Sequence, residues 1–242
     1  AVTLGAASML VLAAAAVGAA IMGLLLEFVA LRPLRRRRAG NLSPLISTIG
    51  VGIFLRSLAL HLFGPESQSF PAALRGSSYR LDGAVVTHVD AIILTVALGL
   101  MAGLWLLLSR TKLGKAMRAT AENQETAALL GVDTQSIVVV TVMLASALGG
   151  VAGVLVGLAF AVSPVMGLPY GLKGLSISVL GGMGNVVGAM VGGLLLGFAE
   201  VITVQLFSSS WREAAAFALL FLLLVVKPDG LFGRRLQAGG KA

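Results

Sequence analysis

The sequence predicts an all-α, polytopic membrane protein: a transmembrane helical bundle of about six spans with one broken or re-entrant helix, forming a single domain over residues 1–242. Hydrophobic residues make up 57% of the chain, charged residues only 12%, and the mean hydropathy is +0.98. Soluble domains average about 45–50% apolar and about 25% charged residues. Six apolar runs lie near the length of about 20 residues that a spanning helix needs: Ala1–Leu26, Leu45–Phe63, Ala91–Ser109, Ser136–Val162, Asn185–Phe207 and the shorter Trp211–Val226.

The positions of the cations predict which ends of these runs face the cytoplasm. Successive segments between the runs carry five, two, four, two and four Lys and Arg residues. Cytoplasmic loops are enriched in Lys and Arg, so residues 32–38, 110–135 and the C-terminus are expected inside, and the loop 64–90 outside. This alternation explains the net charge of +8 without nucleic acid as a partner.

The loops between the first runs are short and have simple expected structures. Glu27–Asn41 is a basic turn. In the outer loop, Tyr79–Leu81 and Ala84–Val86 flank Asp82–Gly83, a pair that suits a two-residue primed turn, so a small hairpin is expected there.

Ser163–Gly184 is predicted to be irregular. Prolines and glycines should break any helix before Leu175 and again after Leu180, leaving Leu172–Leu180 as a short helix of about 14 Å. Non-helical backbone at membrane depth survives only where protein or water satisfies it, and discontinuous helices often mark a transport path. The predicted breakers are Pro164, Gly167, Pro169, Gly171, Gly174, Gly181, Gly182 and Gly184.

Two of the apolar runs carry glycines at a spacing of four residues, which places them on one helical face. Small residues in register let membrane helices approach closely. We therefore expect helix packing rather than ligand binding at Gly149, Gly153, Gly157, Gly188 and Gly192.

The charged segment Arg110–Thr134 is unusual because it lies between two long apolar runs. A slim, Ala-rich helix from about Lys115 to Leu130 is expected, ending at Gly131 because a glycine permits the left-handed conformation after a helix. Either a partner protein grips this helix, with Glu122 and Glu125 available to pair with its cations, or the segment is a solvated loop helix.

The sequence carries no signal for an enzyme. It has no Gly-x-x-x-x-Gly-Lys-Ser/Thr phosphate loop and no cysteine. The two histidines, His61 and His88, lack metal-ligand spacing. No catalytic residue and no metal ligand is therefore assigned.

Several blocks together resemble the LivH-type permease subunits of branched-chain amino acid ABC transporters. These blocks are "RPLRRRRAGNLSPLISTIGVGIFLR", "LGKAMRATAENQETAALLGVD", "SPVMGLPYGLKGLSISVLGGMGNVVGAMVGGLLLGFAE" and "KPDGLFG", and they extend from Arg32 to Gly233. The resemblance implies an importer subunit in the bacterial inner membrane that binds no cofactor itself. Because the family usually has further N-terminal membrane segments, the chain is expected to be truncated.

The resemblance also implies partners. These are a cytoplasmic ATPase that binds ATP, an extracytoplasmic substrate-binding protein and a second, related permease. The charged segment then resembles the coupling segment that engages the ATPase, although Thr126 stands where the pattern has its first Ala. The expected coupling residues are Arg118, Ala119, Glu122, Asn123, Glu125, Ala127, Ala128 and Gly131.

We expect polar residues inside the apolar runs to line a translocation path. Arg56 is costly in lipid and should face protein or water, by forming a structural ion pair, by snorkelling to the membrane surface or by binding a substrate carboxylate. Glu200 is either a neutral or paired structural carboxylate or part of a proton relay. The expected path residues are Ser47, Thr48, Gly50, Arg56, Ser176, Gly181, Gly182, Gly184 and Asn185.

Three alternatives remain open from the sequence. The same kind of permease could carry urea or short amides. The chain could instead be a stand-alone secondary transporter in which Glu200 and Arg56 handle protons or counter-ions. An intramembrane enzyme is a third class, without an identifiable catalytic group.

Overall fold

The structure is a computed structural model that describes residues 2–36, 43–68, 78–81, 84–182, 184–227 and 230–233. Within these residues, six helical segments are long and apolar enough to cross a membrane. They correspond to the six predicted runs, so the all-α polytopic architecture is confirmed and the chain is a multi-pass membrane protein. The first span continues to Leu34, however, so the predicted turn at Glu27–Asn41 is wrong for residues 27–36, which are helical, and residues 37–41 lie outside the described residues. The segments are Met9–Leu34, Ile46–Phe63, Val89–Arg110, Thr134–Ala159, Val186–Leu206 and Ser209–Val226.

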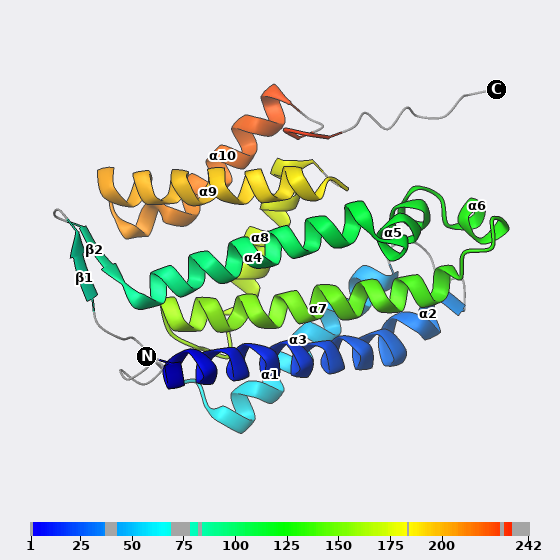
Figure 1. Ribbon diagram of the computed structural model, residues 1–242, viewed down its shortest axis with the longest axis horizontal. Helices are drawn as coiled ribbons and strands as arrows, with labels where there is room; N and C mark the ends of the chain where they lie inside the picture. Colours follow the sequence, from blue (N-terminus) through cyan, green and yellow to red (C-terminus); the bar gives the residue numbers. More distant parts are fainter. Residues whose placement is uncertain are drawn as a thin grey trace. The chain divides into compact units, whose positions relative to one another are not determined.

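The chain divides into two compact units, Ala1–Met166 and Gly167–Ala242. A single permease domain remains a prediction. Figure 1 shows the elements of the first unit: α1 (Val2–Leu26), η1 (Glu27–Leu31), α2 (Arg32–Arg36), α3 (Ser43–Phe63), β1 (Ser78–Leu81), β2 (Ala84–Thr87), α4 (His88–Arg110), α5 (Lys112–Glu122), α6 (Gln124–Leu129) and α7 (Thr134–Ala159). The second unit contains α8 (Gly167–Gly181), α9 (Val186–Leu206), η3 (Ser209–Trp211) and α10 (Arg212–Val226).

In the first unit, α1 and α7 pack side by side along their lengths (Figure 1). The buried side chains at this contact are Leu12, Val151 and Leu155, and α4 covers them with partly buried apolar residues. A Cβ atom at Gly150 would overlap the side chain of Ala19, so the glycine is what lets the two backbones come so close.

The predicted hairpin is confirmed. Strands β1 and β2 pair antiparallel, and the pairing of Leu81 with Ala84 leaves a two-residue connection. The Asp-Gly pair of that connection lies outside the described residues. After β2, the backbone N–H of Thr87 donates to the Asp90 carboxylate at 3.0 Å, which closes the first turn of α4.

In the second unit, the predicted helix break before Leu175 is wrong, because α8 is continuous from Gly167 to Gly181. Pro169 is the third residue of the helix, where a backbone N–H has no intrahelical acceptor and its loss costs little. A glycine inside a helix costs only about 1 kcal/mol relative to Ala, so Gly171 and Gly174 do not interrupt it.

The predicted break after Leu180 is confirmed. α8 ends at Gly181, and Gly182 follows with a φ of +97°. At 15 residues, α8 is about 22 Å long, which is less than the hydrocarbon thickness of about 30 Å. The core of this unit consists of Leu180, Leu196 and Ala216, with one buried residue from each of α8, α9 and α10.

Candidate functional site

The charged segment between α4 and α7 forms two helices instead of the single predicted helix over 115–130. α5 and α6 meet at Asn123, whose backbone is extended, with φ −155° and ψ 109°. The side-chain oxygen of Asn123 accepts a hydrogen bond from the N–H of Thr126 at 2.9 Å. Asparagine favours such N-caps over helix interiors because its side chain competes for backbone groups. The prediction missed this capping signal.

The end of α6 follows the prediction. Gly131 has a φ of +84°. The N–H of Val132 donates to the carbonyl of Ala127 at 3.1 Å, and the N–H of Gly131 donates to that of Ala128 at 3.0 Å. These two bonds form a Schellman motif, which satisfies helix carbonyls that would otherwise lack donors. The turn after α6 is therefore well defined.

The segment is tied back onto the end of α4. The N–H of Gly114 donates to the Thr111 hydroxyl at 3.0 Å. A Cβ atom at Gly114 would overlap the carbonyls of Leu107 and Leu108, and the Arg118 guanidinium donates to that of Leu108. Arg118 therefore links α5 to α4, and its expected role in ATPase coupling stays a prediction.

The exposed surface of the segment differs in part from the predicted one. Ala127 is only 2% exposed, so it packs within the segment, whereas Leu129 and Leu130 are 88% and 79% exposed. The sequence reasoning missed these two leucines, although two adjacent leucines before a helix-ending glycine were the available signal. The remaining predicted coupling residues are exposed: Ala119, Glu122, Asn123, Glu125, Ala128 and Gly131.

Asp133 caps the start of α7. Its carboxylate accepts hydrogen bonds from the hydroxyl of Ser136 at 2.5 Å and from the backbone N–H of Ser136 at 3.3 Å. Both hydrogen bonds stabilise the charged carboxylate and lower the pKa of Asp133 below its usual value of 3.8. The bond from the Ser136 hydroxyl has the larger effect and the bond from its backbone N–H the smaller.

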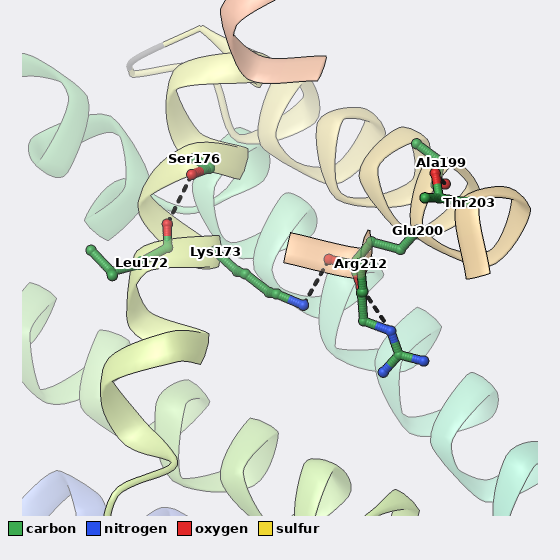
Figure 2. Close-up of polar contacts among 7 residues, drawn as sticks. All are labelled: Leu172, Lys173, Ser176, Ala199, Glu200, Thr203 and Arg212. Atoms are coloured by element: carbon green, nitrogen blue, oxygen red, sulfur yellow. Dashed lines mark hydrogen bonds and ion pairs between the residues drawn. The ribbon is translucent and has the colours of Figure 1, made fainter. Parts of the chain in front are cut away.

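In the second unit, three charged side chains form a cluster among α8, α9 and α10, which we call the charge cluster: Lys173, Glu200 and Arg212 (Figure 2). Lys173 Nζ lies 2.7 Å from Glu200 Oε1, and Arg212 Nε lies 4.0 Å from Glu200 Oε2. Of the open alternatives for Glu200, the structure thus supports the paired structural carboxylate.

The three side chains of the charge cluster differ in their exposure. Those of Lys173 and Glu200 are 19% and 16% exposed, and that of Arg212 is 37% exposed. Lys173 Nζ also lies 5.9 Å from the centre of the Tyr170 ring. The sequence reasoning did not assign a role to Lys173, although it is a lone cation within an otherwise apolar stretch.

At the opposite end of α8, four glycines form a close backbone contact that we call the glycine junction: Gly181, Gly182, Gly188 and Gly230. The N–H groups of Leu231 and Phe232 donate to the carbonyls of Leu180 and Gly181 at 2.9 and 3.1 Å.

Asn185 strengthens the glycine junction from both sides. It caps α9 by accepting from the N–H of Gly188 at 3.1 Å, and its Nδ2 donates to the carbonyl of Phe232 at 3.1 Å. Gly181, Gly182 and Asn185 pack against backbone here, and their expected role in a translocation path stays a prediction. Of the other two predicted path residues in this unit, Ser176 is buried, with its hydroxyl bonded to the Leu172 carbonyl at 3.0 Å, and Gly184 is exposed.

The other predicted path residues lie on α3. Ser47 and Thr48 are half-buried, and Gly50 and Arg56 are exposed. Ser47 and Arg56 are nine residues apart, which is half a turn out of phase on a helix with 100° per residue, so they lie on opposite faces. Among the described residues, none forms an ion pair with Arg56.

The predicted packing glycines behave differently in the two units. A Cβ atom at Gly149 or Gly153 would meet no atom within 4 Å beyond its own helix, and Gly157 is buried. In contrast, a Cβ atom at Gly192 would lie 3.1 Å from the Ile177 carbonyl oxygen, and Gly188 contacts Gly181 directly. The close approach on α7 instead uses Gly150, one residue from the predicted face.

Glu27 is a buried polar residue that the sequence reasoning missed. It has no exposed surface and begins the five-residue π-helical turn η1 at the end of α1.

Across the described part of the chain, no group of three or more His, Cys, Asp or Glu side chains is placed to hold a metal ion.

Comparison with known proteins identifies the family. Residues 1–226 match the family model described as "Branched-chain amino acid transport system / permease component". The chain belongs to this family of transport permeases.

Relatives agree with this assignment over most of their length. The high-affinity branched-chain amino acid transport system permease protein BraD of Pseudomonas aeruginosa is 38% identical over 228 residues, which cover 92% of this chain and 73% of that protein. LivH of Escherichia coli K12, which carries the same description, is 36% identical over 93% of this chain and 75% of its own length. A probable LivH of Methanocaldococcus jannaschii is 27% identical over 88% of this chain and 71% of its own. No solved structure matches the chain.

Proposed function

We propose that this chain is a membrane-spanning permease subunit of an ABC importer that translocates branched-chain amino acids across the bacterial inner membrane. The observation that supports this most strongly is the identity of 36–38% with permeases of that description over more than nine tenths of the chain. The six apolar spans provide a bundle in which such a path can form.

We propose that the α5–α6 segment couples this bundle to a cytoplasmic ATPase. The segment is anchored at Thr111–Gly114 and ends in a fixed turn at Gly131, so a force applied to it is passed to α4 and α7. The exposed Leu129 and Leu130 offer an apolar contact that a partner groove would bury. Glu122 and Glu125 would pair with partner cations around it.

The proposed machine needs further components. ATP is hydrolysed by the separate ATPase, substrate is delivered by an extracytoplasmic binding protein, and a second, related permease supplies the other half of the path. Closure of the ATPase would bias the helices between two packed states, as alternating access requires. The pairing of Glu200 with Lys173 argues against a proton relay at Glu200. It therefore also argues against a stand-alone secondary transporter.

Uptake by proteoliposomes tests this function. The chain is reconstituted with its co-purifying partners, ATP is enclosed on the ATPase side, and radiolabelled leucine is offered with the binding protein outside. The proposal predicts ATP-dependent leucine uptake that excess isoleucine and valine inhibit and urea does not. If only urea or short amides inhibited uptake, the proposed substrate class would be wrong. Uptake without ATP would overturn the proposed ATP-driven mechanism.

A further inference from the structure

The three-helix unit α8–α10 is held by different interactions at its two ends. At the glycine junction, backbone meets backbone: a Cβ atom at Gly230 would lie 2.6 Å from Gly182 Cα, and one at Gly182 would lie 2.7 Å from Gly233 Cα. Two backbone hydrogen bonds from Leu231 and Phe232 cross the same contact. Backbone packed so closely cannot separate without losing all of these contacts at once.

The other end of α8 has little packing. Every residue from Gly167 to Leu172 is exposed, whereas Ser176, Leu180 and Gly181 further along the helix are buried. The apolar core of the unit likewise starts at Ile177 and continues towards Leu180. The first half of α8 therefore lacks the apolar contacts that fix its second half.

The interaction that reaches from this weakly packed half to the neighbouring helices is the charge cluster. Figure 2 shows Lys173 extending from α8 to Glu200 of α9, with Arg212 of α10 on the other side of the same carboxylate. The hydroxyls of Ser176 and Thr203 do not add to it, because each donates to a carbonyl of its own helix.

Ion pairs of this kind suit a contact that opens and closes. In a region of low dielectric the attraction between Lys173 and Glu200 is strong, whereas in water a comparable pair contributes little. Entry of water between α8 and α9 would therefore release the pair, and expulsion of water would restore it, without disturbing the glycine junction.

We propose that the charge cluster is an ionic latch that holds the first half of α8 against α9 and α10, and that it opens during each transport cycle while the glycine junction stays closed as the pivot. This inference rests on the proposed transport function. It assigns Lys173 and Glu200 as positioning residues that set the position of α8, with no direct role in binding the transported molecule.

Distance measurements between spin labels test the latch directly. The chain has no cysteine, so introduced cysteine pairs are the sole labelling sites. One pair, Leu168→Cys with Ile202→Cys, reports on the latch end, and a control pair, Ser178→Cys with Val187→Cys, reports on the junction end; all four positions are exposed. The full chain is measured in lipid nanodiscs, with and without Glu200→Gln.

The latch predicts that Glu200→Gln lengthens and broadens the distance distribution of the first pair and leaves that of the control pair unchanged. An unchanged first pair would show that the ion pair does not hold α8. Equal broadening of both pairs would also overturn the proposal, because the glycine junction would then not be a fixed pivot.

Charge exchange and cross-linking connect the latch to transport. Lys173→Glu and Glu200→Lys should each lower uptake on the order of tenfold, and the double exchange should recover most of it, as expected for residues in contact. A bifunctional cross-link across the Leu168→Cys and Ile202→Cys pair should block uptake. Full uptake by the cross-linked protein, or no recovery in the double exchange, would contradict the latch.

These experiments also separate the latch from the proposed function. The spin-label distances do not depend on which molecule is carried. Distances that respond to Glu200→Gln in a protein that takes up no branched-chain amino acid would therefore refute the substrate and leave the latch intact.

Discussion

Gly131 and Gly182 both follow a helix in the left-handed conformation, with φ values of +84° and +97°, yet their surroundings are opposite. A Cβ atom at Gly131 would meet nothing within 4 Å, whereas one at Gly182 would overlap the backbone of Gly233. The same local conformation therefore ends α6 at an open surface and ends α8 inside a packed junction. The first turn is available to a partner, and the second is already occupied by the chain itself.

The largest effect is expected at the glycine junction, where the second of these turns lies. Gly188→Leu places a side chain where the Gly181 carbonyl lies, and neither backbone can move away without breaking the α8–α9 contact. We expect destabilisation beyond about 4 kcal/mol, the range of severe core substitutions. Thermal unfolding followed by size-exclusion chromatography in detergent measures it. Gly197→Leu on the same helix, with open space around it, is the matched control and should unfold like the wild type.

At the open turn, the expected effect falls on partner binding. Gly131→Pro removes an N–H that donates to the Ala128 carbonyl and imposes a negative φ, so the Schellman turn is lost. Charge reversal at Glu125 removes a proposed ion pair with the ATPase. Both variants should insert normally and fail to retain the ATPase during affinity purification. Normal co-purification of the ATPase with both variants would refute the coupling role.

Within α6, exposure should decide which residues matter for docking. Leu130→Asp changes an exposed side chain, so its effect on stability should stay within about 0.5 kcal/mol, while ATPase retention should fall several-fold. Ala127→Asp, at a buried position two residues before Leu129, should instead destabilise the segment. Hydrogen exchange of α6 distinguishes the two variants, because only Ala127→Asp should accelerate it. If the Leu130→Asp variant retained the ATPase fully, the exposed leucines would not be part of the interface.

The smallest effect is a pH dependence at the start of α7. Because its hydrogen bonds with Ser136 lower the pKa of Asp133 in the folded state, the cap stabilises fully above the ordinary value of 3.8 and is lost as the pH falls through the lowered value. Amide exchange at residues 134–137 should accelerate only at such acidic pH. Asp133→Asn should remove this pH dependence. If amide exchange in that variant still depended on pH in the same way, a group other than Asp133 would be responsible.

The contrast between the two turns also explains what the sequence could predict. The apolar runs and the Asp-Gly hairpin depend on neighbouring residues, and the spans and the strand pairing followed from them. The sidedness indicated by the cation alternation stays a prediction. Gly131 was predicted because a capping glycine acts locally.

The contacts of the second unit were harder to predict because they join residues far apart in the sequence. Gly181 and Gly182 do end α8 as predicted, but the sequence did not indicate that the segment 230–233 packs on them. The pairing of Lys173 with Glu200 likewise needs the α8–α9 geometry. Pro169 was wrongly predicted to break the helix. A proline is tolerated in the first turn of a helix, and the sequence did not show that α8 begins at Gly167.

The proposed coupling depends most on the side of the membrane that the α5–α6 segment faces. A single cysteine at Leu130, in a chain that otherwise has none, can be labelled with a membrane-impermeant maleimide in sealed vesicles of known orientation. We predict labelling in inside-out vesicles and protection in right-side-out vesicles. Labelling in right-side-out vesicles alone would place the segment outside and contradict its proposed coupling to a cytoplasmic ATPase.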